Sequence, residues 1–244
     1  MNFRASEFEF RYRFFFIGGI FWLGFSLYFL DKTNVSFSTA RMILGKTASA
    51  NSPQLDRYTQ VIIGLGALIA ALAALIRSWA EAYLHSSVVH DMELHSDRLV
   101  ADGPYRHVRN PLYLGNILLA VGMGTMASRA GFFVLAAGMT LLCYRLILRE
   151  EAGLLESHGE SYRGYFQSVP RLWPSLRPRV PAGARRPNWL DGFLGETFMW
   201  AFAIAIAVFA WTERLVHFWI IVGAGLAVYF LQNSARKKSE NSVE

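Results

Sequence analysis

The chain has 244 residues, of which 53% are hydrophobic, 15% aromatic and only 17% charged. A soluble globular domain is about 25% charged, and so large an apolar fraction exceeds what one compact core of this size can bury. The single cysteine, Cys143, excludes a disulfide framework and a thiolate zinc site. The formal charge of +6 does not indicate nucleic-acid binding, because the basic residues cluster between apolar runs. We therefore expect an integral membrane protein that binds no nucleic acid.

Six apolar runs predict an all-α, polytopic membrane protein with about six transmembrane helices. They cover residues 12–30, 61–76, 112–127, 131–148, 198–211 and 215–231. A helix needs about 20 apolar residues to cross a bilayer, and we expect the second run to continue towards Leu84. The fifth run is short for a span and could be re-entrant. The three-residue connection between the third and fourth runs predicts a helical hairpin.

The basic residues predict how the helices are oriented. With both termini on one side of the membrane, that side carries 18 Lys and Arg residues and the other side carries six. Basic loops stay in the cytoplasm. We therefore expect both termini and the polar segments 77–111 and 145–196 to be cytoplasmic, in a bacterial inner membrane. Segment 31–57 would form a structureless loop on the opposite side.

The first cytoplasmic segment ends in a pattern that predicts the start of the third membrane helix. Residues 102–104, Asp-Gly-Pro, form a turn, Asn110 is a good N-cap and Pro111 a good first helical residue. Free backbone N–H groups at this start, flanked by Arg106 and Arg109, would suit an anionic group. The alternative is that Asn-Pro only caps the helix and the arginines only bind lipid headgroups.

The second cytoplasmic segment extends the fourth membrane helix as an amphipathic stretch. The residues that continue its helical spacing are Glu151, Leu154, Leu155, His158, Tyr162 and Tyr165. Glu150 and Glu151 lie where the helix leaves the membrane. A carboxylate at that depth is costly unless a positive group is bound nearby, which favours a functional role for this pair.

Taken together, these motifs resemble those of the isoprenylcysteine carboxyl methyltransferase family and its phospholipid N-methyltransferase relatives, over roughly residues 60–176. The matching motifs are Arg77-Ser78-Trp79-Ala80, Leu99-Val100, Gly103-Pro104-Tyr105, Arg109-Asn110-Pro111-Leu112-Tyr113-Leu114-Gly115, Glu150-Glu151 and Val169-Pro170-Arg171. Isoprenylcysteine enzymes usually have His at the position of Asn110, whereas Asn is common in the phospholipid relatives. The acceptor is therefore left open between an isoprenylcysteine carboxylate, methylated on oxygen, and a phospholipid amine, methylated on nitrogen.

The resemblance implies an S-adenosylmethionine-dependent methyltransferase that acts on a lipid-like or lipidated acceptor. By this resemblance the cofactor would contact Asp97, Arg98, Leu99, Val100, Gly103, Tyr105, Asn110, Pro111, Leu112, Tyr113 and Glu150. Tyr105 and Tyr113 offer aromatic faces to the sulfonium and the adenine, Glu150 can pair with the ammonium, and Arg109 suits the carboxylate. A carboxylate acceptor needs no base, whereas an amine must lose a proton, for which Glu151 and His107 are the candidates.

The resemblance also divides the chain into four parts. These are an N-terminal helix and loop (1–57), a methyltransferase-like membrane core (58–178), a basic Pro-rich linker (179–196) and a C-terminal hairpin with a basic tail (197–244). Gly64-Leu-Gly66 and Gly122-Met-Gly124 lie inside apolar runs without a preceding strand, so we interpret them as packing glycines rather than nucleotide-binding turns.

Other functions are less consistent with the sequence. A metal site would need a loop to bring together its candidate ligands, which are His85, His90, Asp91, Glu93, His95 and Asp97. A transporter should carry charges near the middle of its helices, and almost none are found there. The alternative that remains is a non-catalytic membrane protein or a transporter of the same fold.

Overall fold

The structure is a computed structural model that describes residues 3–45, 49, 52–91 and 101–240. Every regular element within these ranges is a helix, which confirms the predicted all-α class. The elements are α1 (Glu7–Arg11), α2 (Arg13–Ser26), η1 (Leu27–Phe29), α3 (Val35–Leu44), α4 (Pro53–Asp91), η2 (Gly103–Arg106), α5 (Pro111–Gly124), α6 (Arg129–Phe133), η3 (Val134–Gly138), α7 (Met139–His158), α8 (Glu160–Ser168), α9 (Trp189–Gly195), α10 (Thr197–Thr212) and α11 (Leu215–Glu240).

Each predicted apolar run forms a helix, but the helices differ in length. Among the described residues, three are long and apolar enough to cross a membrane, over Pro53–Leu84, Arg129–His158 and Leu215–Gln232. The helices α9 and α10 would form a fourth span, bent by 63° between Gly195 and Thr197. The bend accounts for the short fifth run in the sequence. The helices α2 and α5 are apolar but have only 14 residues each, so they are shorter than the transmembrane spans that the sequence predicts.

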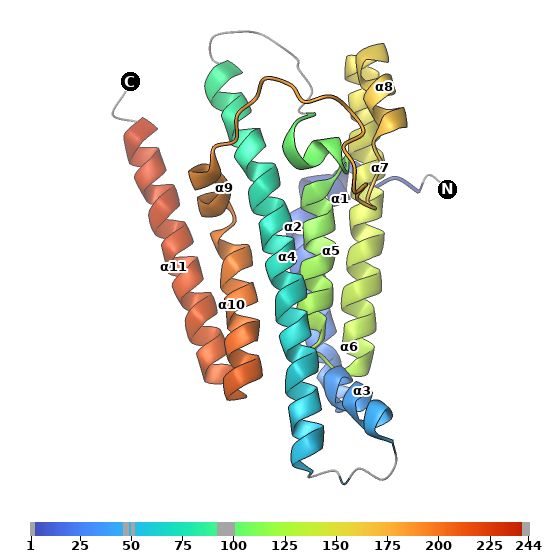
Figure 1. The fold of residues 1–244 in the computed structure, drawn as a ribbon, viewed down its shortest axis with the longest axis vertical. Helices are drawn as coiled ribbons and strands as arrows, with labels where there is room; N and C mark the ends of the chain where they lie inside the picture. Colours follow the sequence, from blue (N-terminus) through green and yellow to red (C-terminus); the bar gives the residue numbers. More distant parts are fainter. Residues whose placement is uncertain (1–2, 46–48, 50–51, 92–100, 241–244) are drawn as a thin grey trace.

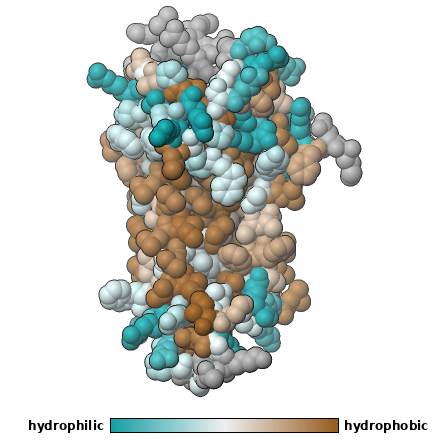
Figure 2. All heavy atoms as spheres, turned by 45° about the vertical axis from the view of Figure 1, so that its right-hand side comes forward, coloured by the Kyte–Doolittle hydropathy of each residue, from teal (hydrophilic) through white to brown (hydrophobic). Residues whose placement is uncertain are grey.

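The long helix α4 lies in the middle of the bundle, with α5 and α7 on one side and α10 and α11 on the other (Figure 1). Small side chains fill the contacts around it, including the buried Ala70, Ala73, Ala74 and Ala203. Small residues let helices approach closely in lipid, where packing replaces the hydrophobic effect. The surface shows a hydrophobic middle band between two hydrophilic ends, as a bilayer requires (Figure 2).

The predicted hairpin is formed by α5 and the continuous helical run α6–η3–α7. Ser128 begins its second arm, because its hydroxyl accepts a hydrogen bond from the amide of Gly131 at 3.0 Å. The segment before it differs from the expectation, since residues 31–57 contain α3 and the first turn of α4 rather than a structureless loop. Asn34 caps α3 through a bond from the amide of Phe37 at 3.0 Å, a signal that the sequence carries as Asn before an apolar run.

The short helices α1 and α8 both contact α7. Helix α1 docks on α7 through the ion pair between Glu9 and Arg145 at 2.8 Å, and the Arg145 guanidinium is the main cause that lowers the pKa of Glu9 to about 2. At the C-terminal end of α7, Gly159 adopts a left-handed φ of 53°, which breaks the amphipathic extension into α7 and α8.

Candidate active site

The predicted helix start is present, but Asn110 does not cap it. Pro111 is the first residue of α5, and Asn110 occupies the N-cap position without a side-chain bond to the helix. Its amide instead donates to Glu151 at 3.1 Å and to the carbonyl of Arg171 at 3.2 Å. The expected capping role of Asn110 is therefore wrong. Its side chain ties the start of α5 to α7 and to the segment after α8, and it leaves the first backbone N–H groups of α5 without a side-chain cap.

Glu151 is the centre of a buried charge cluster. Its side chain is 4% exposed, and its two carboxylate oxygens accept bonds from Arg109 Nε at 2.9 Å and Arg171 Nε at 2.8 Å. Arg109 also donates to the carbonyl of Phe166 and lies 4.1 Å from the centre of the Phe166 ring. Arg171 donates in addition to the hydroxyl of Tyr144 at 2.8 Å. The cluster fastens the start of α5, helix α7 and the end of α8 to one another.

Glu150 has different surroundings from its neighbour. It is half-buried, and one of its carboxylate oxygens accepts a hydrogen bond from the hydroxyl of Tyr113 at 2.7 Å. Unlike Glu151, it forms no ion pair with any residue that the structure describes. The bond from Tyr113 joins the first turn of α5 to α7, so the two predicted stretches meet on the same side of the bundle.

The turn before α5 is shaped by Gly103 and Tyr105. Gly103 has a φ of +58°, and a Cβ atom there would collide with the ring of Tyr83 on α4, so only glycine fits. Tyr105 is 8% exposed, and its carbonyl accepts a bond from the Tyr165 hydroxyl at 2.9 Å. Burial, helped by the charge of Glu81, raises the pKa of Tyr105 well above its usual value.

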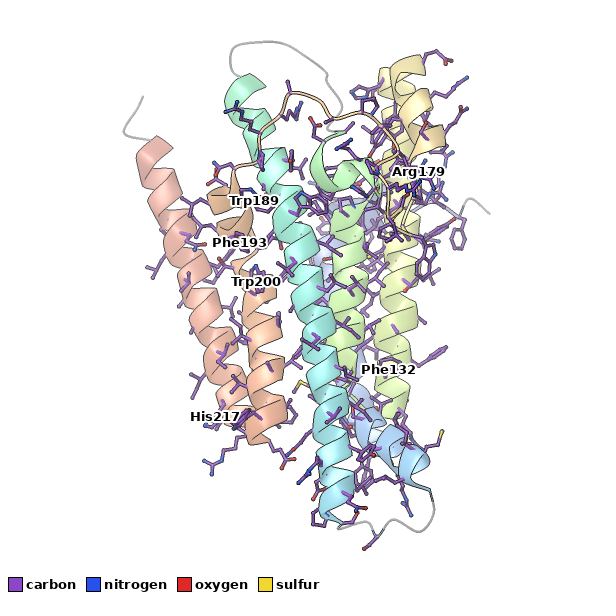
Figure 3. The ribbon with its side chains drawn as sticks, viewed as in Figure 1. Phe132, Arg179, Trp189, Phe193, Trp200 and His217 are labelled. Carbon is purple, nitrogen blue, oxygen red and sulfur yellow. The ribbon has the colours of Figure 1, made fainter. Side chains whose placement is uncertain are left out.

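The segment from Pro170 to Asn188, here called the strap, runs along this turn. His107 Nδ1 lies 2.7 Å from the carbonyl of Ser175, and the amide of Ser175 donates to the carbonyl of His107 at 2.9 Å. Arg106 and Arg179 continue the pairing further along the strap. Figure 3 shows Arg179 on the strap beside α7 and α8. The strap includes much of the predicted linker and is bonded to the core along its length.

The described structure thus brings together most of the predicted site residues. Gly103, Tyr105, His107, Arg109, Asn110, Pro111, Leu112, Tyr113, Glu150 and Glu151 all lie on η2, at the start of α5 or near the end of α7. Asp97, Arg98, Leu99 and Val100 lie outside the described residues, as do the side chains of His85, His90, Asp91, Glu93, His95 and Asp97 that we considered for a metal. Among the described residues no group of three or more His, Cys, Asp and Glu could hold a metal ion.

Three residues that we did not predict as site residues from the sequence belong to this arrangement. Arg171 is part of the Val-Pro-Arg motif, which could have identified it as the partner of a buried glutamate. Tyr144 and Phe166 carry no comparable signal, because an aromatic residue in an apolar or amphipathic helix is most often part of the packing. Their roles depend on contacts between helices that the sequence does not reveal.

Two curated relatives are similar to this chain, both at 28% identity. The cobalt-zinc-cadmium resistance protein CzcN of Cupriavidus metallidurans aligns over 48% of this chain and 50% of its own length. The nickel-cobalt-cadmium resistance protein NccN of Alcaligenes xylosoxydans xylosoxydans aligns over 57% of this chain and 66% of its own length. The chain therefore spans half to about two thirds of these relatives. No solved structure matches it.

A family model gives the more direct identification. The phospholipid methyltransferase model matches residues 59–161, which extend from the early part of α4 to the start of α8. This range holds the start of α5 and both glutamates of α7. Residues 59–161, which are less than half of the chain, are therefore similar to the phospholipid methyltransferase family.

Proposed function

We propose that the protein is a methyltransferase that uses S-adenosylmethionine and acts at the cytoplasmic surface of the membrane on a lipid-like or lipidated acceptor. The similarity of residues 59–161 to the phospholipid methyltransferase family supports methyl transfer. The helices of bilayer length support a membrane location. The cofactor, the acceptor class and the cytoplasmic orientation are the parts that we add.

One observation carries the assignment of the cofactor site, namely the contrast between the two adjacent glutamates. Arg109 and Arg171 form direct ion pairs with Glu151, whereas among the described residues Glu150 is hydrogen-bonded only by the hydroxyl of Tyr113, and Arg13 acts on it without forming an ion pair. A half-buried carboxylate without a direct ion pair is costly, and a bound cation lowers that cost. S-adenosylmethionine carries both a sulfonium and an ammonium, so Glu150 and Tyr113 fit one side of it.

S-adenosylmethionine supplies an electrophilic methyl group when it is bound. The protein then has to bind and orient the reactants and exclude water, an effect worth up to about 7–11 kcal/mol for ideal alignment. Tyr113 and Glu150 would hold the positive end of the cofactor, and the uncapped backbone N–H groups of α5 would suit its carboxylate. Gly103 and Tyr105 would form the wall next to α4.

The geometry favours a positioning role for Glu151 and Arg109 rather than direct contact with the reactants. Glu151 accepts three bonds from two arginines and Asn110, so its oxygens are engaged and it is a poor proton acceptor. If the acceptor is an amine, His107 is the better candidate base. A carbonyl can only accept a bond, so His107 Nδ1 must carry the proton that points to Ser175, which leaves Nε2 with a free lone pair in the neutral ring.

The cofactor site is tested by isothermal titration of S-adenosylmethionine into the full chain in detergent. We expect the wild type to bind and Glu150→Gln to bind roughly tenfold more weakly, the loss expected for one hydrogen bond to a charged group. Glu156→Gln is the matched control, because Glu156 is an exposed residue of the same helix. No heat from the wild type, or equal affinity in all three proteins, would contradict the assignment.

The acceptor is identified by transferring a radiolabelled methyl group from the cofactor into a total membrane extract. Label in a phospholipid headgroup would show methylation of an amine, and a base-labile ester would show methylation of a carboxylate. Binding of the cofactor without any transfer would favour the non-catalytic alternative. The names of the two relatives concern metal resistance, and we propose that any such role here would act through methylation of a membrane component.

A further inference from the structure

A large cavity lies between α2 on one side and the α10–α11 hairpin on the other, over the faces of α4 and α5. Its volume is about 1560 Å³, whereas ordinary small-molecule sites measure about 300–1,000 Å³. Its walls are mainly aromatic and aliphatic, with Phe21, Phe25, Phe202, Phe218 and Leu226 among them. A cavity of this size and composition inside a membrane protein suits a ligand with a long apolar chain.

Both ends of the cavity carry polar residues, and the end next to the start of α5, here called the polar end, carries a buried ion pair. Arg77 donates to both carboxylate oxygens of Glu196, at 2.7 Å each, and to Asn116 Oδ1 at 3.1 Å. All three residues line the cavity. Because Asn116 Oδ1 accepts from Arg77, the amide nitrogen of Asn116 is left as a donor, and no described residue accepts from it. This end therefore offers hydrogen-bond donors to the head of a bound molecule.

The polar end adjoins the proposed cofactor site. Arg77 also donates to the carbonyl of Leu112 at 3.1 Å, in the first turn of α5 that carries Asn110 and Tyr113. The opposite end of the cavity is lined by Gln60 and Glu213, which are bonded to each other at 2.8 Å. Arg77 lies 17 positions after Gln60 on α4, about 25 Å along the helix at 1.5 Å per residue. The polar end thus lies near the membrane surface, next to the site.

The ion pair itself calls for a role beyond stability. Glu196 is 4% exposed, and burying two charges costs about as much as their attraction returns. Glu196 lies at the bend between α9 and α10, outside residues 59–161. Gly192 and Gly195 let this bend pack directly on α4, and Trp200 donates to Ser78 there at 3.0 Å. Figure 3 shows Trp189, Phe193 and Trp200 along the same bend.

We propose that Arg77, Asn116 and Glu196 form the head-group end of the acceptor site, with the apolar chain of the acceptor in the cavity. Glu196 is then a positioning residue that the C-terminal hairpin adds to residues 59–161. The ligand is a long-chain amphiphile whose head accepts hydrogen bonds, either a diacyl phospholipid or an isoprenoid conjugate. That this ligand is the methyl acceptor rests on the proposed function. That a long-chain amphiphile binds in the cavity does not depend on the proposed function.

The cavity is tested by narrowing it from α11. Leu226→Trp adds bulk at a lining residue that is 38% exposed, and Leu231→Trp, on the same helix at 70% exposure, is the control outside the cavity. Photoactivatable phospholipid and isoprenoid probes, each in vesicles of neutral lipid, should label cavity residues of the wild type and of Leu231→Trp. We expect Leu226→Trp to lose most of this labelling. The probe that labels the cavity identifies the source of the chain.

Enzyme kinetics then test the head-group end. In Glu196→Gln the KM for a long-chain acceptor should rise roughly tenfold, which corresponds to the loss of one buried charged hydrogen bond. The affinity of this variant for S-adenosylmethionine, and the KM of the control Glu156→Gln, should stay within about twofold of the wild type. In Leu226→Trp the rise in KM should be larger for long than for short acceptors, which a general loss of structure would not produce.

An unchanged KM in both variants, or a parallel loss of affinity for S-adenosylmethionine, overturns the proposal. A wild type without cofactor binding but with a labelled cavity would overturn the proposed function and leave the lipid site.

Discussion

At the level of single residues, Glu151 shows how a charge is accommodated in this protein. Its side chain is 4% exposed and is held by two guanidinium groups and one amide. A buried carboxylate of this kind contributes little net stability when it is fully paired, but removing one partner leaves a charge that is poorly compensated. The cluster should therefore be sensitive to the loss of either arginine.

We expect Arg171→Ala to destabilise the protein by about 3 kcal/mol, because Glu151 would keep only Arg109 as a charged partner. The measurement is thermal unfolding of the full chain in one detergent. Arg163→Ala is the control, since the Arg163–Glu160 pair is 58% and 82% exposed and should contribute less than about 1 kcal/mol. Equal melting temperatures for the two variants would show that the cluster does not hold these helices together.

Sequence patterns identified part of this site and could not identify the rest. The Asn-Pro helix start and the Glu-Glu pair were visible because polar residues beside an apolar run are unusual. Asn110 was predicted as a cap because its spacing fits one, yet a tertiary partner, Glu151, binds its side chain instead. The polar end of the cavity was not foreseen, because Glu196 and Asn116 meet Arg77 from residues 119 and 39 positions away.

At the level of elements, the contact between α4 and α5 depends on two glycines. A Cβ atom at Gly66 would lie 2.7 Å from the carbonyl oxygen of Gly122, and one at Gly122 would lie 2.6 Å from the carbonyl oxygen of Gly66. Each obstacle includes a backbone oxygen, which cannot move aside as a side chain can, and at Gly66 the Thr125 side chain is also in the way. The two helices therefore approach as closely as glycine allows, as the sequence pattern predicted for Gly66 and Gly122. The same prediction is wrong for Gly64, where a Cβ atom would meet nothing within 4 Å.

We expect Gly66→Ala to separate α4 from α5 and to lower the melting temperature, while Gly64→Ala leaves it unchanged or raises it. Gly64 is on the same helix, and a Cβ atom there would meet nothing within 4 Å. Alanine favours a helix over glycine by about 1 kcal/mol, so Gly64→Ala measures propensity alone. Thermal unfolding of both variants in the same detergent separates the effect of close packing at Gly66 from the effect of helix propensity. A similar effect in both would exclude a close packing role for Gly66.

Element boundaries were predicted less well than element existence. All six apolar runs became helices, but α3 was expected to be a loop, since its ten residues include three Ser or Thr and Arg41. The contact of this segment with the α5–α6 connection explains its order, because Ser36 donates to the carbonyl of Thr125 at 2.7 Å. The strap is a comparable case, in which backbone bonds to η2 and its flanks order a Pro-rich segment that the sequence marks as a linker.

At the level of the whole molecule, the chain places its proposed chemistry at one end of the bundle. The start of α5, the end of α7, α8 and the strap lie at that end, and α3 with the start of α4 lies at the other (Figure 1). The count of basic residues predicts that the first end faces the cytoplasm. S-adenosylmethionine is a charged molecule of the cytosol, so the proposed function requires this orientation.

Cysteine labelling from one side of the membrane tests the orientation directly. Cys143 is fully buried, so the wild type should stay unlabelled by a membrane-impermeant maleimide. Ser157 on α7 and Thr39 on α3 are both exposed and lie at opposite ends of the molecule. We expect Thr39→Cys to be labelled in intact spheroplasts and Ser157→Cys only after the membrane is opened. The reverse pattern would place Glu150 and Tyr113 on the side without cofactor, and the proposed methyl transfer could then not occur, whatever the chemistry of the site.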